Sequence, residues 1–148
     1  GKINSSWNSS TVPAGFLQFN TAYNWRVKVW DEADAASDWA NGPNFTTQKH
    51  AAPSVNFSWA PTNPLVNQTT QFADQTTIFG GASVSSWLWS FQNGNPGSSS
   101  IQNPQTKFTS QGTKTTTLSV TDSDSLQCSA SKNVEVGLPP PQFKEVTP

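Results

Sequence analysis

The stretch Val84-Ser-Ser-Trp-Leu-Trp-Ser-Phe-Gln-Asn-Gly94 decides the fold of this chain. Its large residues alternate with smaller ones, so that Trp87, Trp89 and Phe91 fall on one side of an extended strand. A period of two indicates a strand with one buried face, and three aromatic side chains on that face can bury a large apolar area. Asn93-Gly94 then gives a turn signal, because both residues tolerate positive φ. We therefore predict a central core strand of a small β-sandwich.

Composition limits the class of protein. The 148 residues carry 8 Lys and Arg against 9 Asp and Glu, a formal net charge of −1, together with 7 Trp and 9 Phe. Abundant aromatic residues argue against disorder, and the near-zero charge argues against nucleic acid as a partner. No apolar run reaches the length of a membrane span. The chain has no Met and no signal peptide, from which we expect a segment of a longer protein. A single Cys excludes an internal disulfide and leaves the redox compartment open.

Alternating segments on both sides of the core strand extend the β prediction. Residues 16–30 form a half-buried strand pattern, and residues 114–120 and 126–136 form two more. Short strands at near-regular spacing, with no helical period, predict an all-β sandwich. The predicted core residues are Tyr23, Trp25, Trp87, Trp89, Phe91, Leu118, Val120 and Cys128.

A second motif precedes the core strand. Leu17, Thr21 and Tyr23 have the spacing Leu-x-x-x-Thr-x-Tyr, followed by Trp-Arg-Val, an acidic turn, Ser-Asp-Trp and Phe-Thr-Thr. Residues 16–47 thus resemble the second half of a fibronectin type III domain. The resemblance implies that the Tyr23 hydroxyl forms a tyrosine corner with the preceding loop. A full sandwich of this kind needs about 100 residues. The chain therefore begins in mid-domain, or the missing strands come from a strand-exchanged homodimer.

The core strand itself belongs to a longer ordered set of motifs. In chain order these are Phe72-Ala-Asp74, Trp89-Ser-Phe-Gln-Asn-Gly94, Asn103-Pro104, Gly112, Leu118-Ser-Val-Thr-Asp122 and Val134-Glu-Val136. Residues 54–136 resemble a PKD (polycystic kidney disease) domain, an immunoglobulin-like module. Ser90 and Asn93 stand where that family usually has Asp, and Lys114 stands near a usual Tyr, so any ion-binding role of those Asp residues does not carry over.

The resemblances predict four segments. Residues 1–48 are a partial fibronectin III-like domain and 49–53 are a linker. Residues 54–137 are a PKD-like β-sandwich and 138–148 are a Pro-rich linker, which is stiff because prolines favour polyproline II.

Carboxylates gather at two predicted hairpin turns, one with Asp31 and Asp34 and the other with Asp122 and Asp124. Ca²⁺ takes flexible oxygen ligands, and some PKD domains bind calcium, so each of these turns is a candidate calcium site. The alternative is that Asp favours turns through bonds to its own backbone. We expect no other cofactor.

Three tryptophans fall in loops or at strand ends, namely Trp7, Trp30 and Trp39. Exposed Trp rings can stack on sugars, so these residues are the candidate ligand-binding site. The alternative is rim packing or a domain interface. His50 is interpreted as a solvated linker residue and Cys128 as a buried, inert thiol. Without a second His or Cys, neither a nucleophilic dyad nor a zinc site is indicated.

The sequence favours a non-enzymatic module of a large modular protein that is extracellular or on the cell surface. Its expected role is spacing and adhesion, with protein or polysaccharide partners at the cell surface. The alternative is a carbohydrate-binding accessory module of a secreted hydrolase. An enzyme in its own right would need a constellation of catalytic residues that the sequence does not offer. The localisation rests on the family resemblance.

Overall fold

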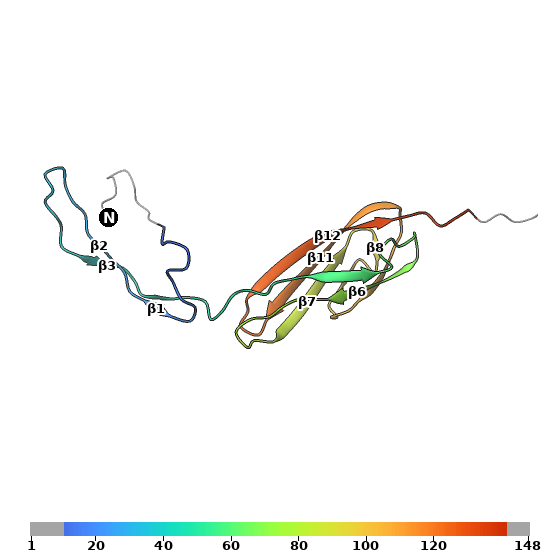
Figure 1. Cartoon of the computed structure of the whole chain (residues 1–148), viewed down its shortest axis with the longest axis horizontal. Helices are drawn as coiled ribbons and strands as arrows, with labels where there is room; N and C mark the ends of the chain where they lie inside the picture. Colours follow the sequence, from blue (N-terminus) through green and yellow to red (C-terminus); the bar gives the residue numbers. More distant parts are fainter. Residues whose placement is uncertain (1–10, 142–148) are drawn as a thin grey trace, which may run out of the picture. The chain divides into compact units, whose positions relative to one another are not determined.

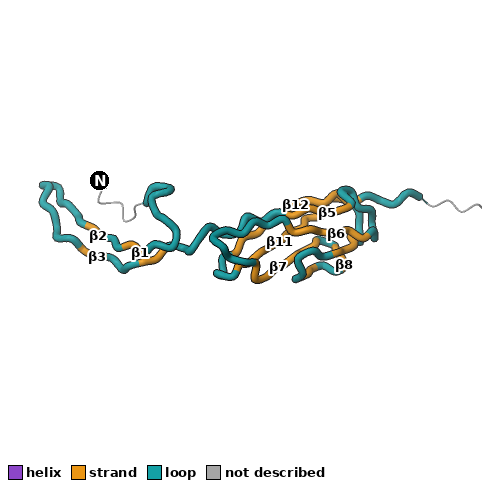
Figure 2. The backbone as a smooth tube through the Cα atoms, turned by 60° about the horizontal axis from the view of Figure 1, so that its bottom comes forward, coloured by secondary structure: helices purple, strands orange, loops and turns teal. Residues whose placement is uncertain are grey.

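The computed structural model describes residues 11–141. These residues form strands joined by loops, and none of them is helical (Figure 2). The chain divides into two compact units between Ala51 and Ala52. Among the described residues, no helix has the length and apolar character that crossing a membrane requires.

The second unit contains eight strands in two four-stranded sheets (Figure 1). The strands of the first sheet, in spatial order, are β5 (Phe57–Ala60), β6 (Thr69–Asp74), β10 (Gln105–Phe108) and β8 (Gly94–Asn95). Those of the second are β12 (Gln127–Val136), β11 (Gly112–Asp122), β7 (Val84–Phe91) and β9 (Ser98–Ser99). The strands within each sheet pair antiparallel.

Strand β7 begins at the predicted residue and ends at Phe91. Its register places Trp89 opposite Leu118 and Trp87 opposite Val120 on β11. At its end Asn93 has a φ of 55°, which is the left-handed conformation that asparagine tolerates. Gly94 follows where a side chain has no room, because a Cβ there would lie 2.6 Å from Phe91 Cβ. The Asn-Gly turn therefore ends the strand as the sequence indicates.

The core lies between the two sheets and centres on Trp89, which is fully buried. Its ring centroid lies 5.2 Å from that of Phe57 in an edge contact and 5.5 Å from that of Phe72. Its indole Nε1 donates a hydrogen bond to the Ile101 carbonyl at 3.0 Å, so the one polar atom of the ring is satisfied. The buried hydrophobic residues are Phe57, Phe72, Trp89, Phe91, Phe108, Leu118, Val120, Val134 and Val136.

Two predicted core residues of this unit differ from expectation. Trp87 is only part-buried and packs against the margin of the core. Cys128 is exposed, so its assignment to the core is wrong. Cys128 pairs with the buried Val120, so its side chain is on the core-facing side of the sheet. However, β12 is the edge strand of that sheet. A residue on an outer strand can point inward and still lie beyond the margin of the facing sheet.

The first unit consists of short strands paired two by two. Strands β1 (Ala22–Tyr23) and β4 (Phe45–Thr46) form one pair, and β2 (Arg26–Val27) and β3 (Ala40–Asn41) form the other. The Tyr23 hydroxyl accepts a hydrogen bond from the Gln18 backbone amide at 2.9 Å. Its ring stacks on Phe45 with centroids 5.8 Å apart. Tyr23 thus ties the loop before its strand, as a tyrosine corner does.

Trp25 was predicted to be a core residue, and this is wrong, since it is 49% exposed. Val27 and Val29 share its parity and are exposed as well. The described residues of this unit form two two-stranded sheets, and the exposure of these side chains shows that neither sheet covers that face. The Trp25 ring instead lies against Gly42, where a Cβ would overlap it. The fibronectin III-like assignment of this unit remains a prediction.

The predicted linker is more ordered than its sequence indicates. His50 is 5% exposed, and its Nδ1 lies 2.8 Å from the Ala51 carbonyl oxygen. The interpretation of His50 as a solvated residue is therefore wrong. Pro53 is buried too.

Candidate binding site

Trp39 precedes β3 on the β2–β3 hairpin and is 49% exposed. The guanidinium carbon of Arg26 lies 4.3 Å from its ring centroid and Lys28 Nζ lies 5.7 Å from it. Cations at these distances are attracted to the face of an indole ring. Trp39 is therefore part of an aromatic and basic surface, and a ligand that stacks on the same ring face must displace Arg26.

Trp30 lies nearer the tip of the same hairpin and is 41% exposed. It forms a β-bridge with Ala36. A shallow hollow of about 350 Å³ is lined by Val29, Trp30, Asp31, Ala35, Ala36 and Ser37. The third predicted ligand-binding residue, Trp7, lies outside the described residues. The structure thus leaves Trp30 and Trp39 partly accessible, and their role in binding stays a prediction.

In each of the two acidic turns, an Asp carboxylate accepts hydrogen bonds from backbone amides. Asp31 Oδ1 accepts hydrogen bonds from the amides of Ala33 and Ala35, at 2.9 and 2.8 Å. In the other turn, Asp122 is buried and its Oδ1 accepts from the amides of Asp124 and Leu126, at 3.0 and 2.9 Å. Asp34 has a φ of 64°, which places it in the left-handed region typical of a turn residue. These contacts are those of turns that an Asp side chain stabilises.

This donor set does not fit calcium. Ca²⁺ takes about six to eight oxygen ligands, whereas within residues 11–141 no three His, Cys, Asp or Glu residues gather in a metal-binding group. Asp31 and Asp34 lie in the first unit and Asp122 and Asp124 in the second, so each turn offers two of the four predicted ligands.

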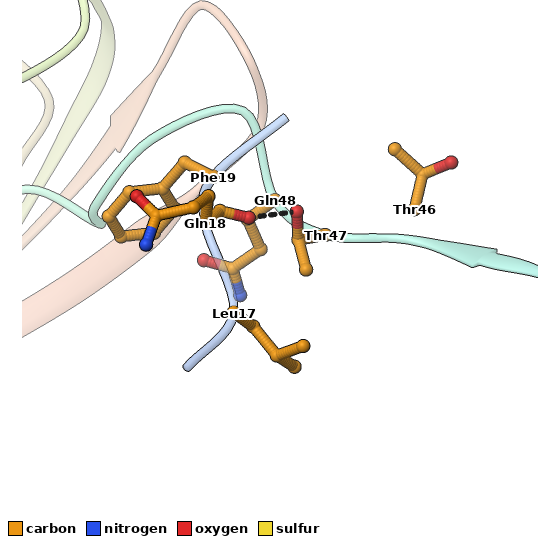
Figure 3. Close-up of a pocket in the computed structure, with 6 residues that line it drawn as sticks. All are labelled: Leu17, Gln18, Phe19, Thr46, Thr47 and Gln48. Atoms are coloured by element: carbon orange, nitrogen blue, oxygen red, sulfur yellow. Dashed lines mark hydrogen bonds between the residues drawn. The ribbon is translucent and has the colours of Figure 1, made fainter. Parts of the chain in front are cut away.

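A second hollow, of about 380 Å³, was not foreseen from the sequence (Figure 3). It lies between the loop before β1, residues 17–19, and the end of β4 with the two residues that follow it, residues 46–48. Thr47 Oγ1 donates to the Gln18 carbonyl at 2.6 Å and holds the two segments together. The lining residues are Leu17, Gln18, Phe19, Thr46, Thr47 and Gln48. Without a His, Cys or acid in its lining, this hollow can offer apolar contact and neutral hydrogen bonds.

Sequence reasoning also missed a polar contact between the sheets of the second unit. Trp87 Nε1 donates a hydrogen bond to Asp74 Oδ2 at 2.7 Å, and Asp74 Oδ1 accepts from the Thr76 amide at 2.9 Å. The Asp74 amide in turn donates to Asn103 Oδ1 at 2.9 Å. Asp74 therefore joins β6 to β7 and to the loop before β10. The Phe-x-Asp motif was the signal that could have marked it.

The outer face of the β11–β12 hairpin is the other feature that was missed. Hydroxyl residues alternate along β11 from Thr113 to Thr121, and polar residues face them on β12. Their side chains form a row of cross-strand contacts. The alternation is visible in the sequence, whereas the pairing depends on the strand register.

Comparison with known proteins identifies the second unit. The family model described as PKD domain matches residues 50–136. The chain belongs to the PKD family. The immunoglobulin-like β-sandwich predicted for this unit is thereby confirmed. A separate search of curated protein sequences found no significant match. PKD domains are generally non-catalytic modules of extracellular or secreted proteins.

Solved structures with similar folds include two PKD domains from Vibrio. The PKD1 domain of Vibrio anguillarum Epp is 26% identical with a TM-score of 0.51, over 60% of this chain and 98% of that one. The PKD1 domain of the Vibrio cholerae metalloprotease PrtV is 22% identical with a TM-score of 0.50, over 59% of this chain and 99% of that one. A carbohydrate-binding module of the β-sandwich superfamily is 21% identical with a TM-score of 0.53, over 60% of this chain and 35% of that one.

The departures from the PKD pattern are accommodated locally. Ser90 is exposed on the outer face of β7, and Asn93 occupies the turn. Lys114, near a usual Tyr, is buried and its Nζ donates to the Gln111 carbonyl at 2.7 Å. The PKD core thus tolerates these changes.

Proposed function

We propose that this chain is a non-enzymatic spacing and adhesion segment of a large modular protein, secreted or on the cell surface, and that it contacts protein or glycan partners. The observation that carries the proposal is the PKD sandwich itself. Its centre is filled by packed aromatic and aliphatic side chains around Trp89. The Asp74 carboxylate accepts a hydrogen bond from Trp87 on the facing sheet, and the Asp122 carboxylate accepts one from a backbone amide of its own turn. A filled core with structural carboxylates suits a rigid spacer better than a catalytic cleft.

The end of the sandwich supports the spacing role. The Gly137 amide donates to the Pro64 carbonyl and the Val66 amide donates to the Gly137 carbonyl, each at 2.9 Å. This parallel bridge fastens the chain as it leaves β12, just before the prolines at 139–141. Because the end of β12 is bonded to the sandwich and the proline segment after it is stiff, the orientation of the sandwich constrains the direction of the chain beyond it.

The test uses the parent protein. Residues 54–136 are deleted in one variant and replaced in another by an unrelated β-sandwich of similar length. Adhesion that falls on deletion and stays low on replacement supports binding by this domain, and recovery on replacement supports spacing. A parent with undiminished adhesion after the deletion contradicts the proposal.

A second candidate function is a carbohydrate-binding accessory module of a secreted hydrolase. The accessible rings of Trp30 and Trp39 favour it, since such rings offer apolar faces with a polar edge. In this case Trp39→Ala in the full chain abolishes binding to soluble polysaccharide, measured by isothermal titration. Binding unchanged in both Trp30→Ala and Trp39→Ala excludes this site.

The open face of the first unit supports a partner of a different kind. Trp25, Val27 and Val29 are exposed along one side of the hairpin, and an apolar face of this kind favours pairing with another chain. We propose a strand-exchanged homodimer in which strands of a second copy cover these faces. Sedimentation should show a dimer that Val27→Lys dissociates, and a wild-type monomer at high concentration contradicts it.

A further inference from the structure

The outer face of the β11–β12 hairpin is a regular array of polar side chains, all of them uncharged except Glu135. Lys114, Thr116, Leu118 and Val120 of β11 are buried, so the alternate residues face outward. The register sets each of them opposite a polar residue of β12. We name this set the hydroxyl ladder; its rungs are Thr113–Glu135, Thr115–Asn133, Thr117–Ser131, Ser119–Ser129 and Thr121–Gln127.

Each rung is a side-chain hydrogen bond. In the two rungs formed by hydroxyl pairs, the oxygens lie 2.8 Å apart for Thr117 and Ser131 and 2.7 Å apart for Ser119 and Ser129. Two threonine hydroxyls donate to β12, Thr113 Oγ1 to Glu135 Oε1 at 2.8 Å and Thr115 Oγ1 to Asn133 Oδ1 at 3.3 Å. In the last rung, Gln127 Nε2 donates to Thr121 Oγ1 at 3.2 Å. The rungs repeat at every second residue, at a spacing of roughly 6.8 Å along the strands. Five rungs therefore extend over about 27 Å.

The rungs hold the side chains in place and still leave capacity for a ligand. A hydroxyl has one donor and two acceptor sites, so a pair such as Ser119 and Ser129 uses one donor and keeps the other hydrogen available. Asn133 keeps its amide hydrogens, because it accepts through Oδ1. Threonine is stiff at χ1, and a rotamer already fixed by its rung loses little entropy when a ligand binds.

The charge and polarity of the side chains in and beside the ladder restrict the class of ligand that it can bind. Glu135 is the single ionisable residue in the rungs and lies at one end. The neighbouring strand β7 adds Ser86 and Ser90 and, between them, Leu88, which is 59% exposed. Apart from Glu135 at its end, the face is therefore uncharged, is rich in both donors and acceptors, and carries one apolar side chain near its middle. Among the rungs a polyanion would meet no basic group and a polycation would meet only Glu135. A large apolar partner would bury the remaining donor and acceptor sites of the hydroxyls without hydrogen-bond partners.

We propose that the hydroxyl ladder binds an extended chain of an uncharged polysaccharide. Sugar hydroxyls would exchange hydrogen bonds with successive rungs, while Leu88 would contact the apolar face of a sugar ring. This inference rests on the glycan-contact part of the proposed function and assigns the contact to the PKD domain instead of to Trp30 and Trp39 of the first unit.

The experiment is a depletion binding isotherm of the full 148-residue chain on suspended microcrystalline cellulose, chitin and granular starch. Wild type should bind at least one of them saturably. Thr115→Val with Thr117→Val removes two outward hydroxyls and keeps the β-branched shape that strands favour. This double variant should bind roughly tenfold more weakly, the loss that two ordinary hydrogen bonds produce.

The matched control is Thr69→Val with Thr77→Val, two exposed threonines outside the ladder, which should bind as wild type does. Circular dichroism establishes that each variant is folded. Equal binding by the ladder variant and wild type overturns the inference, and so does an equal loss in the control. If Trp39→Ala alone reduces binding, the glycan function stands and its site is in the first unit. A folded wild-type chain that binds none of the three polymers overturns the ladder inference and the glycan-contact part together, while the spacing role remains open to the replacement test.

Discussion

The bond between Trp87 Nε1 and Asp74 Oδ2 offers a direct test of how the PKD sandwich is held together. Asp74 also accepts from the Thr76 amide, so Asp74→Ala leaves two donors unpaired in a part-buried site. A hydrogen bond to a charged group contributes about 1.5–3 kcal/mol. Partial exposure favours the lower end for each bond, and we expect the free energy of unfolding to fall by about 2–3 kcal/mol. Trp87→Phe removes one of the two bonds and should lower it by about 1–2 kcal/mol.

The double variant shows whether the two residues act through each other. If the bond is real, the losses are not additive, and the coupling free energy should be about 1 kcal/mol. Guanidinium unfolding followed by far-UV circular dichroism is the suitable assay, because Trp87→Phe removes a fluorophore. Asp74→Asn keeps one acceptor oxygen and should fall between wild type and Asp74→Ala. Losses that add to within about 0.3 kcal/mol refute the reasoning.

Three further predictions concern packing and exposure in the same domain. Phe72→Ala should destabilise the sandwich by about 3–5 kcal/mol in chemical unfolding, because its fully buried ring lies 4.9 Å from that of Phe91; a loss below about 1 kcal/mol would contradict that packing. Gly94→Ala should cost about 1–3 kcal/mol through overpacking, and Gly97→Ala, where the nearest atom lies at 3.5 Å, should cost less; the reverse order would be inconsistent with the turn geometry. Cys128 should react with a thiol reagent in the folded protein nearly as fast as in the unfolded protein, since it is exposed; protection until unfolding would show that it is buried.

Much of the PKD fold could be predicted from the sequence because period-two patterning reports directly on strands. The aromatic alternation and the Asn-Gly turn predicted where β7 begins and approximately where it ends. Leu118 and Val120 are buried where alternation places them. Parity assigns a side of the sheet, however, and does not say whether anything covers it. Cys128 on an outer strand and Trp25 on an open face both failed for that reason.

The candidate site was less accessible to sequence reasoning. Trp39 was predicted as a candidate ligand-binding residue, but its contact with Arg26 across the hairpin depends on register. The rungs of the hydroxyl ladder also require a register, which the Asp122 turn sets by accepting from the amides of Asp124 and Leu126. The contact between Asp74 and Trp87 spans 13 residues of sequence. Contacts of this kind arise from the way strands meet, which local patterns do not encode.

The measurement that tests the central claim most directly is a titration of the intact chain against polysaccharides and matrix proteins, read by tryptophan fluorescence, with the ligand analysed afterwards. A non-enzymatic adhesion module predicts saturable binding to at least one of these partners and recovery of that partner chemically unchanged. A flat titration from a folded sample would contradict the adhesion part of the account, and conversion of the ligand into new products would contradict its non-enzymatic part.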